Sequence, residues 1–282
     1  MGQGFLSRVF GGGSSKESGG GGAPGKANAR ISNRELQTAL RNAQDNPAGI
    51  QQARLLIEQL GNQLSNAERA EAYRQLAAAP SYRNQRDNSK DPDTTCNFTS
   101  QAMAFEALGL DYQEKARGKQ AEEQLYDRFY AKGMGSRIEE KDRMKLARDQ
   151  GLRAWQLDTP TFGSGVDARK WFEANVLPQL QGGASATMGI KSGTFRHVVR
   201  VQWVESGGVR LDDPWGEAVG YGKGEFGYSS LNEGASGKKT LGGDQKGKGD
   251  DRPIPWDSIA TIMSKRYVQF YNTKGGGAGK GS

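Results

Sequence analysis

The chain has 282 residues, which is enough for one large domain or two small ones with a sizeable buried core. With 34% hydrophobic residues and 41 glycines, part of it is expected to lie outside any packed core. The net charge of +7 favours anionic partners such as nucleic acid, acidic cell-wall polymer or a lipid surface, without choosing among them. No apolar run is long enough to span a membrane, and residues 5–10 are too short for the hydrophobic part of a secretory signal.

The N-terminal part of the chain divides into a tether and a helical segment. Residues 1–31 contain runs of Gly and Ser, which predict a flexible tether with little capacity to fold. Residues 32–80 are predicted to form a small helical module. Its three helix-start signals are two capping boxes and an N-cap followed by proline: Ser32 with Glu35, Ser65 with Glu68, and Asn46 with Pro47. We find no chemistry in this module, and hypothesise that residues 1–80 dock to delivery machinery or a chaperone.

The only cysteine follows a polar turn at residues 91–95. Apolar residues then recur at helical spacing until Gly109 ends the pattern: Phe98, Ala102, Phe105 and Leu108. Cys96 is therefore predicted to lie in the first turn of an amphipathic helix. Unpaired backbone N–H groups and the helix dipole stabilise a thiolate there, which lowers the pKa of the thiol. The alternative is a small residue that only packs at a helix start.

Helices are followed by strands in the second half of the chain. Residues 111–180 are predicted to be mainly helical, and the periodicity changes to that of strands after Gly182 and Gly183. The predicted strands are 184–190, 197–204, 209–211 and 267–271. A helix that carries the cysteine, followed by an antiparallel sheet, indicates an α+β fold.

The counts of cysteine and histidine limit the kinds of reactive or metal-binding site that the chain can form. A single Cys cannot form an internal disulfide, and one Cys with one His cannot build a four-ligand zinc site without several carboxylates. Cys96 can instead act as a thiol nucleophile, with His197 as its general base. That chemistry needs no metal and no organic cofactor.

A carboxylate is available to orient the histidine. If the predicted hairpin folds about Glu205, His197 and Asp213 stand opposite each other on one face of the sheet. Asp213 could then hold one imidazole nitrogen and leave the other for the thiol, as a catalytic triad requires. Asp212 would point to the other face, and a register shift of one residue would exchange the two. The alternative is that Asp213 and Pro214 only terminate the strand.

Four segments carry a family resemblance. They are Gln85-Arg86-Asp87-Asn88, Thr95-Cys96-Asn97-Phe98-Thr99-Ser100-Gln101-Ala102-Met103, His197-Val198-Val199 and Asp213-Pro214-Trp215-Gly216. In this order they resemble the bacteriocin-processing-peptidase-like (double-glycine peptidase-like) family of papain-fold cysteine peptidases, over residues 82–272. The resemblance implies a papain-like α+β fold, with the nucleophile at a helix N-terminus packed against an antiparallel sheet that carries His and Asp. It also implies Cys96 as nucleophile, His197 as base and Asp213 as its orienting acid.

The same resemblance assigns an oxyanion donor, and the order and context of its residues argue against two rival families. It implies that Gln85 and the Cys96 backbone N–H bind the oxyanion, with Asn84 and Asn88 as neighbouring alternatives to Gln85. An acetyltransferase effector, whose His precedes the acid and the Cys, would need a different order. Transglutaminases share the Cys-His-Asp order, but the residues around Gln85 and Cys96 fit the peptidase better.

The predicted function is that of a cysteine hydrolase which cleaves amide bonds. Family members that process leader peptides are usually fused to a membrane transporter, and the absence of a predicted span argues against that role. By analogy with soluble members, we expect an exported or phage-type bacterial enzyme that acts on peptide cross-links of peptidoglycan. It would reside in the producer's cytoplasm until a dedicated secretion system or phage release delivers it. The alternatives are an effector protease (a bacterial toxin) that cleaves a host or competitor protein, and a catalytically silent papain-fold binding module.

Two further segments complete the predicted organisation. Residues 217–252 are a Gly- and Lys-rich insertion, read either as a solvated loop or as a flexible rim over the cleft. Its six Lys and Arg are balanced by six Asp and Glu, so it is not a basic arm for nucleic acid. Residues 273–282 are predicted to be a disordered tail.

Overall fold

The structure is a computed structural model that describes residues 29–192, 195–216, 218–219, 227–228 and 249–273. Three predicted segments lie wholly or mostly outside the described residues. They are residues 1–28 of the tether, most of the 217–252 insertion and residues 274–282 of the tail.

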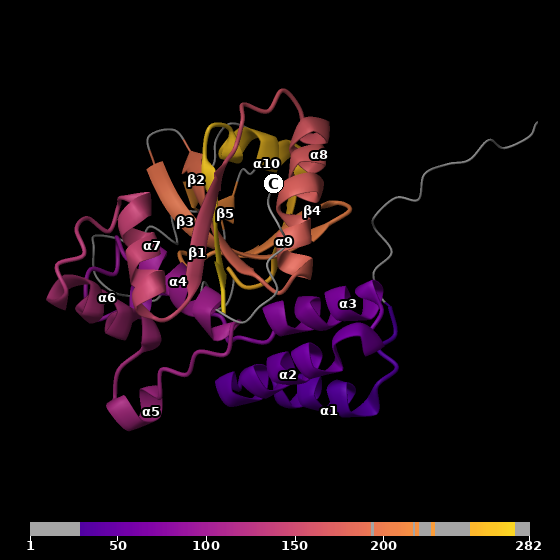
Figure 1. The fold of residues 1–282 in the computed structure, drawn as a ribbon. Coiled ribbons are helices and arrows are strands. Elements are labelled where there is room, and N and C mark those ends of the chain that lie inside the picture. The colour runs from indigo at the N-terminus through magenta and orange to yellow at the C-terminus, as the bar shows by residue number, and fades with distance from the viewer. Residues whose placement is uncertain (1–28, 193–194, 217, 220–226, 229–248, 274–282) are drawn as a thin grey trace, which may run out of the picture.

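The described chain is an α+β structure built on one antiparallel six-stranded sheet (Figure 1). The strand order is β1-β8-β2-β3-β4-β7, and each neighbouring pair is antiparallel. The strands are β1 (Arg153–Asp158), β2 (Ser185–Ser192), β3 (Phe195–Glu205), β4 (Gly208–Asp212), β7 (Arg252–Pro255) and β8 (Tyr267–Asn272). Two short strands, β5 (Ala218–Val219) and β6 (Gly227–Tyr228), pair with each other. The predicted fold class is confirmed at this level.

Helices cover both faces of the sheet, because successive strand side chains point to opposite faces. Phe270 belongs to a hydrophobic cluster with α1–α3 and α8–α10, whereas Tyr271 belongs to a second cluster with α4, α6 and α7. The helices are α1 (Arg34–Asn42), α2 (Pro47–Leu60), α3 (Asn66–Ala77), α4 (Cys96–Glu106), α5 (Glu114–Arg117), α6 (Ala121–Ala131), α7 (Glu140–Asp149), α8 (Gly165–Asn175), α9 (Leu177–Gln181) and α10 (Trp256–Met263). The sheet is therefore the middle layer of the core.

The three predicted helices of the N-terminal module are present, with one correction to their caps. Ser65 and Glu68 form the predicted capping box. The predicted box at Ser32 is wrong: Asn33 caps α1, while Ser32 donates to the Glu68 carboxylate. The Ser32 hydroxyl thus links the start of α1 to the start of α3.

This helical module shares its core with the rest of the protein. Arg54 of α2 is buried, and its guanidinium donates to the carbonyls of Ala107 and Gly183 at 3.4 and 2.7 Å. At the end of α4, a Cβ on Gly109 would lie 2.9 Å from the backbone of Gln51. The module is consequently packed onto the C-terminal end of the helix that begins with Cys96.

The stretch 111–180 is mainly helical, as predicted, but residues 153–158 within it form the unpredicted edge strand β1, which pairs with buried β8. One further sequence prediction is wrong. The helix α4 is not amphipathic: all its residues from Asn97 to Glu106 are buried, since it lies between the sheet and α6. Its polar side chains find internal partners instead, as Ser100 does at the Val198 carbonyl (2.9 Å).

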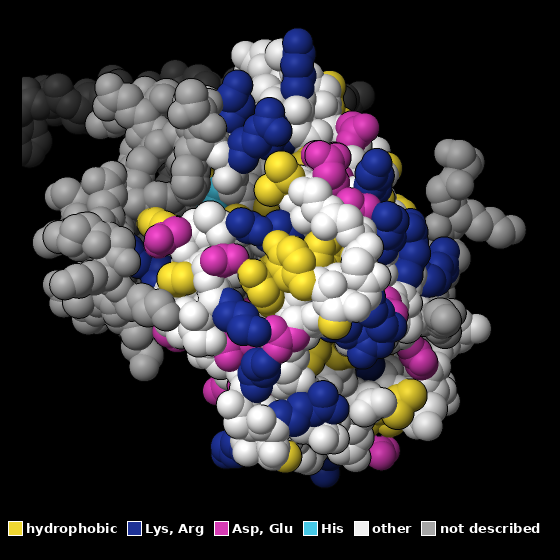
Figure 2. All heavy atoms as spheres, turned by 90° about the vertical axis from the view of Figure 1, so that its left-hand side faces the viewer, with side chains coloured by type: hydrophobic (Ala, Val, Ile, Leu, Met, Phe, Trp, Pro, Cys, Tyr) yellow, Lys and Arg dark blue, Asp and Glu magenta, His cyan; other side chains and the backbone are white. Residues whose placement is uncertain are grey.

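The outer surface of the α6 and α7 side mixes both charges. Figure 2 shows Lys and Arg interspersed with Asp and Glu on this face rather than gathered into one basic patch. None of the helices in the described ranges is both long and apolar enough to cross a membrane.

The packing of α2 against α4 can be tested at Gly109, which has φ +87°. Gly109→Ala should lower the free energy of unfolding by ~1–2 kcal/mol for the left-handed backbone and by ~1–3 kcal/mol more for the overlap with Gln51. Gly151→Ala is the matched control, because Gly151 has φ +83° and no atom within 4 Å of the added Cβ. Urea unfolding of both variants measures the difference, and equal losses would contradict the close contact.

Candidate active site

Cys96 is the first residue of α4, as the sequence predicts. The residue is partly exposed, while the neighbours that hold the helix start are buried. Asn88 donates from Nδ2 to the hydroxyls of Thr95 and Thr99, at 2.8 and 3.2 Å. The thiol therefore sits at an ordered helix N-terminus, where the unpaired N–H groups and the dipole favour a negative charge.

His197 and Asp213 are in direct contact. The Nε2 atom of His197, on β3, lies 2.7 Å from Oδ1 of Asp213, and both side chains are almost completely buried. The same carboxylate oxygen accepts the backbone N–H of Trp215 at 2.9 Å. Because Nε2 is bonded to Asp213, Nδ1 is the ring nitrogen left for the thiol.

This contact does not arise from the predicted register. Arg200 pairs with Asp212, and the hairpin turns at residues 206–207, with Glu205 opposite Gly208. A bulge between Val201 and Trp203 shifts the register once more. The prediction that the hairpin is centred on Glu205, with His197 opposite Asp213, is therefore wrong. Asp213 follows the end of β4 and reaches the histidine from a turn.

Backbone contacts hold Asp213 in that turn. Its N–H donates to the Gly249 carbonyl at 2.8 Å, and its own carbonyl accepts the Tyr82 hydroxyl at 2.6 Å. A Cβ on Gly249 would lie 2.0 Å from the Asp213 carbonyl oxygen, so only glycine allows this approach. A residue near the end of the 217–252 insertion thus supports the carboxylate.

The neighbouring carboxylate, Asp212, has a different partner. It accepts a hydrogen bond from Arg200 at 2.7 Å, and both side chains are buried. Burial raises the pKa of Asp212 even though the Arg200 charge opposes this. Of the two adjacent acids that the sequence offered, only Asp213 is bonded to His197 among the described contacts.

The thiol and the imidazole stabilise each other's charged forms. Burial favours the neutral thiol, but the charge of His197, a hydrogen bond with its ring, the Val198 backbone N–H and the charge of Arg143 together lower the pKa of Cys96. For His197, burial favours the neutral ring, yet the charges of Asp213 and Cys96 and hydrogen bonds to both raise its pKa to about 10. The arrangement therefore favours the charged pair, a thiolate beside an imidazolium, over the neutral pair.

Gln85 connects the turn after Asp213 to the loop before Cys96. It is buried in a 3₁₀ turn (Gln85–Asp87), its backbone N–H donates to the Pro214 carbonyl, and its side-chain Nε2 donates to the Pro92 carbonyl, both at 2.8 Å. Its neighbour Asn84 accepts from the Arg86 N–H, whereas the Asn88 amide is engaged at Thr95 and Thr99.

Two groups near the thiol were not found from the sequence. The Val198 group is a backbone N–H, which almost any residue at that position would supply, so the sequence gives no signal for it. Arg143 lies in a stretch of many charged residues, and no pattern distinguishes it from them. Within the described ranges, no three or more His, Cys, Asp and Glu residues are grouped so as to hold a metal ion.

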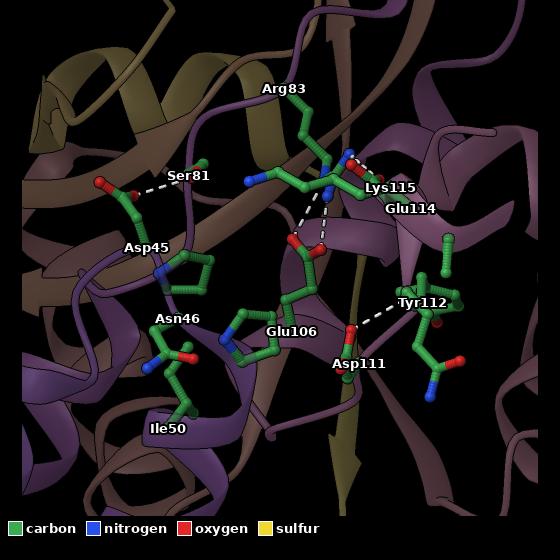
Figure 3. Close-up of a pocket in the computed structure, with 14 residues that line it drawn as sticks. Asp45, Asn46, Ile50, Ser81, Arg83, Glu106, Asp111, Tyr112, Glu114 and Lys115 are labelled. Carbon is green, nitrogen blue, oxygen red and sulfur yellow. Dashed lines mark hydrogen bonds and ion pairs between the residues drawn. The ribbon is translucent and has the colours of Figure 1, made fainter. Parts of the chain in front are cut away.

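A pocket of about 480 Å³ lies elsewhere, between the start of α2, the linker after α3 and the end of α4. In it Arg83 reaches Glu106 and Glu114 (Figure 3), and it also bonds Glu122 at 2.9 Å. Cys96, His197, Asp213 and Gln85 are not among its lining residues. The pocket is therefore separate from the site described above.

Comparisons of the chain with protein-family models, with curated proteins and with solved structures found no match.

The charge pairing at Cys96 predicts the pH dependence of its alkylation. Iodoacetamide should label the wild-type thiol with an inflection below its ordinary pKa of 9.0, because the imidazolium stabilises the thiolate. His197→Ala removes that cation and should move the inflection up by ~1–3 pH units, and Asp213→Asn by less. Since the chain has one cysteine, the rate reports Cys96 alone.

The control is the protein unfolded in denaturant, whose alkylation rate should show the pH inflection of an ordinary thiol. A wild-type inflection at the unfolded value, unmoved by His197→Ala, would contradict the pairing.

Proposed function

We propose that the protein is a cysteine hydrolase of papain-like type that cleaves amide bonds by acyl transfer. The observation that supports this most is the buried 2.7 Å contact between His197 Nε2 and Asp213 Oδ1, with the ring's other side turned to the only cysteine. This order of thiol, imidazole and carboxylate is the arrangement that activates a thiol nucleophile. The position of Cys96 at the start of α4, packed on β2 and β3, is the feature that favours a papain-like arrangement.

The proposed reaction begins with the Cys96 thiolate, which attacks the carbonyl carbon of the scissile amide. The C–N bond then breaks as the His197 imidazolium gives its proton to the leaving nitrogen. Neutral His197 next accepts a proton from water, which attacks the thioester; the C–S bond then breaks, releasing the acid product and restoring the thiolate beside the imidazolium. Asp213 keeps the ring oriented and stabilises its charged form in both steps.

The oxyanion formed in each step needs donors. The Cys96 backbone N–H is one of the unpaired amides at the start of α4. Gln85 is the second proposed donor: Nε2 carries two hydrogens, and its bond to the Pro92 carbonyl leaves one of them. Since that bond also anchors the loop before Cys96, Gln85 would fix the nucleophile as well as bind the oxyanion.

Peptide cross-links of peptidoglycan are the substrate class that we propose. The positive net charge would favour approach to an acidic cell-wall polymer. Cys96 is also a partly exposed residue, as the approach of a large substrate requires. An effector protease acting on another protein would use the same residues, and only substrate trials separate the two. A silent binding module would need no charge pairing at Cys96.

Release of soluble fragments from purified peptidoglycan tests the proposal. The wild type should clear the suspension and release peptides that mass spectrometry assigns to one cleaved bond, and Cys96→Ala should release none. His197→Ala should slow release by ~10²–10⁴-fold, because the proton transfers lose their donor.

If the wild type releases nothing while Cys96 alkylates rapidly at neutral pH, peptidoglycan is ruled out, the proposed enzyme stands and protein substrates are tested next. If the thiol is also inert, the proposed enzyme is wrong and a binding module remains.

A further inference from the structure

The loop between α6 and α7 is bonded to residues on both sides of Cys96. Asn97 donates from Nδ2 to the Arg137 carbonyl at 2.9 Å. The Arg137 guanidinium in turn donates to the Thr94 carbonyl. Because Thr94 and Asn97 bracket the cysteine, this loop runs alongside the start of α4.

Arg143, in the first half of α7, is held by that loop and by β8. Its side chain is 2% exposed and so cannot be a simple surface charge. Its donors reach four acceptors: the carbonyls of Arg137 (3.3 Å) and Ile138 (2.9 Å), the hydroxyl of Tyr267 (2.5 Å) and Oε1 of Gln269 (3.4 Å). Its own carbonyl accepts Nε2 of Gln101, one turn along α4 from Asn97. The guanidinium is therefore fixed relative to the helix that carries the nucleophile.

The acceptors of Arg143 are all neutral. Among the described residues, no carboxylate lies within 4.0 Å of this guanidinium, whereas buried Arg200 is paired with Asp212 and Arg83 with three glutamates. An uncompensated buried charge costs several kcal/mol. A nearby anion would offset that cost, and the Cys96 thiolate is close enough for the charge of Arg143 to act on it.

The Tyr267 ring places Arg143 next to the strand pair that supports Cys96. A Cβ on Gly189 would lie 2.4 Å from that ring, so the ring fills the space beside Gly189. Gly189 pairs with Val198, whose N–H is bonded to the thiol. The Arg143 guanidinium stacks on the same ring at 5.2 Å.

We propose that Arg143 is a positioning residue of the Cys96 site, whose fixed, uncompensated positive charge stabilises the thiolate and the anionic intermediate that forms on it. It acts at a distance through the low-polarity interior, since it is too buried to touch substrate. This inference rests on the proposed function, because it assigns a role in the same acyl transfer.

The charged and titratable groups that face the thiol come from three elements. They are His197 of β3, Arg143 of α7 and Tyr267 of β8, while Asp213 acts through His197. Burial raises the pKa of Tyr267 to about 12, although the Arg143 charge opposes this, so the phenol stays neutral over the working range. His197 and Arg143 are consequently the two cations whose removal is compared below.

The test is the pH profile of Cys96 alkylation by iodoacetamide in the full chain. Arg143→Met should raise the inflection by about 1 pH unit, and Arg143→Lys should restore part of that shift because it keeps the charge. Arg54→Met is the matched control: Arg54 is also buried, bonded to two carbonyls and stacked on a tyrosine (Tyr73, 5.4 Å), but its bonds lie at the other end of α4. Arg54→Met should lose stability and leave the inflection unchanged.

Each outcome decides something different. An inflection that responds to His197→Ala but not to Arg143→Met overturns the role of Arg143 and leaves the proposed enzyme intact. An inflection that responds to neither substitution overturns both the role of Arg143 and the proposed enzyme. If Arg143→Met does not fold, Tyr267→Phe removes one anchor of the guanidinium and should give a smaller upward shift, whose absence would also overturn the role.

Discussion

The buried hydrogen bond between His197 and Asp213 is the interaction on which the candidate site depends. A carboxylate and an imidazole this deeply buried are stable only if every polar atom is held, and the protein holds Asp213 through its backbone. Tyr82 comes from the linker after α3, and Gly249 from the end of the 217–252 insertion. Segments far apart in the sequence thus meet at one carboxylate.

Three buried arginines and the largely buried Arg83 connect the layers of the molecule in two distinct ways. Arg200 and Arg83 are paired with carboxylates, and their charges are neutralised locally. Arg54 and Arg143 are bonded to neutral acceptors, at the two ends of α4. Arg54 joins the N-terminal helices to the end of that helix, so residues 32–80 are part of the scaffold that positions Cys96. Arg143 lies near the start of α4 and, in the role proposed above, supplies positive charge to the Cys96 site.

The sequence predicted the elements better than it predicted their contacts. The helix start at Cys96 follows from turn residues and apolar spacing, and the counts of one Cys and one His limited the candidate pair to Cys96 and His197. The register of β3 with β4 was not predictable, because a bulge near Gln202 has no local signal. The burial of α4 on all sides, and the roles of Arg143 and Gly249, depend on tertiary packing that no periodicity reports.

The central claim is that the imidazole of His197 is a cation beside a thiolate. Because the chain has a single histidine, its ring resonances in an NMR pH titration belong to His197 alone. The account predicts that the ring stays protonated well above its ordinary value of 6.5 and loses its proton only near pH 10. Substitution Cys96→Ala should lower that transition, since it removes the thiolate. A ring that titrates near 6.5 in the folded protein, whether or not Cys96 is present, would contradict the claim.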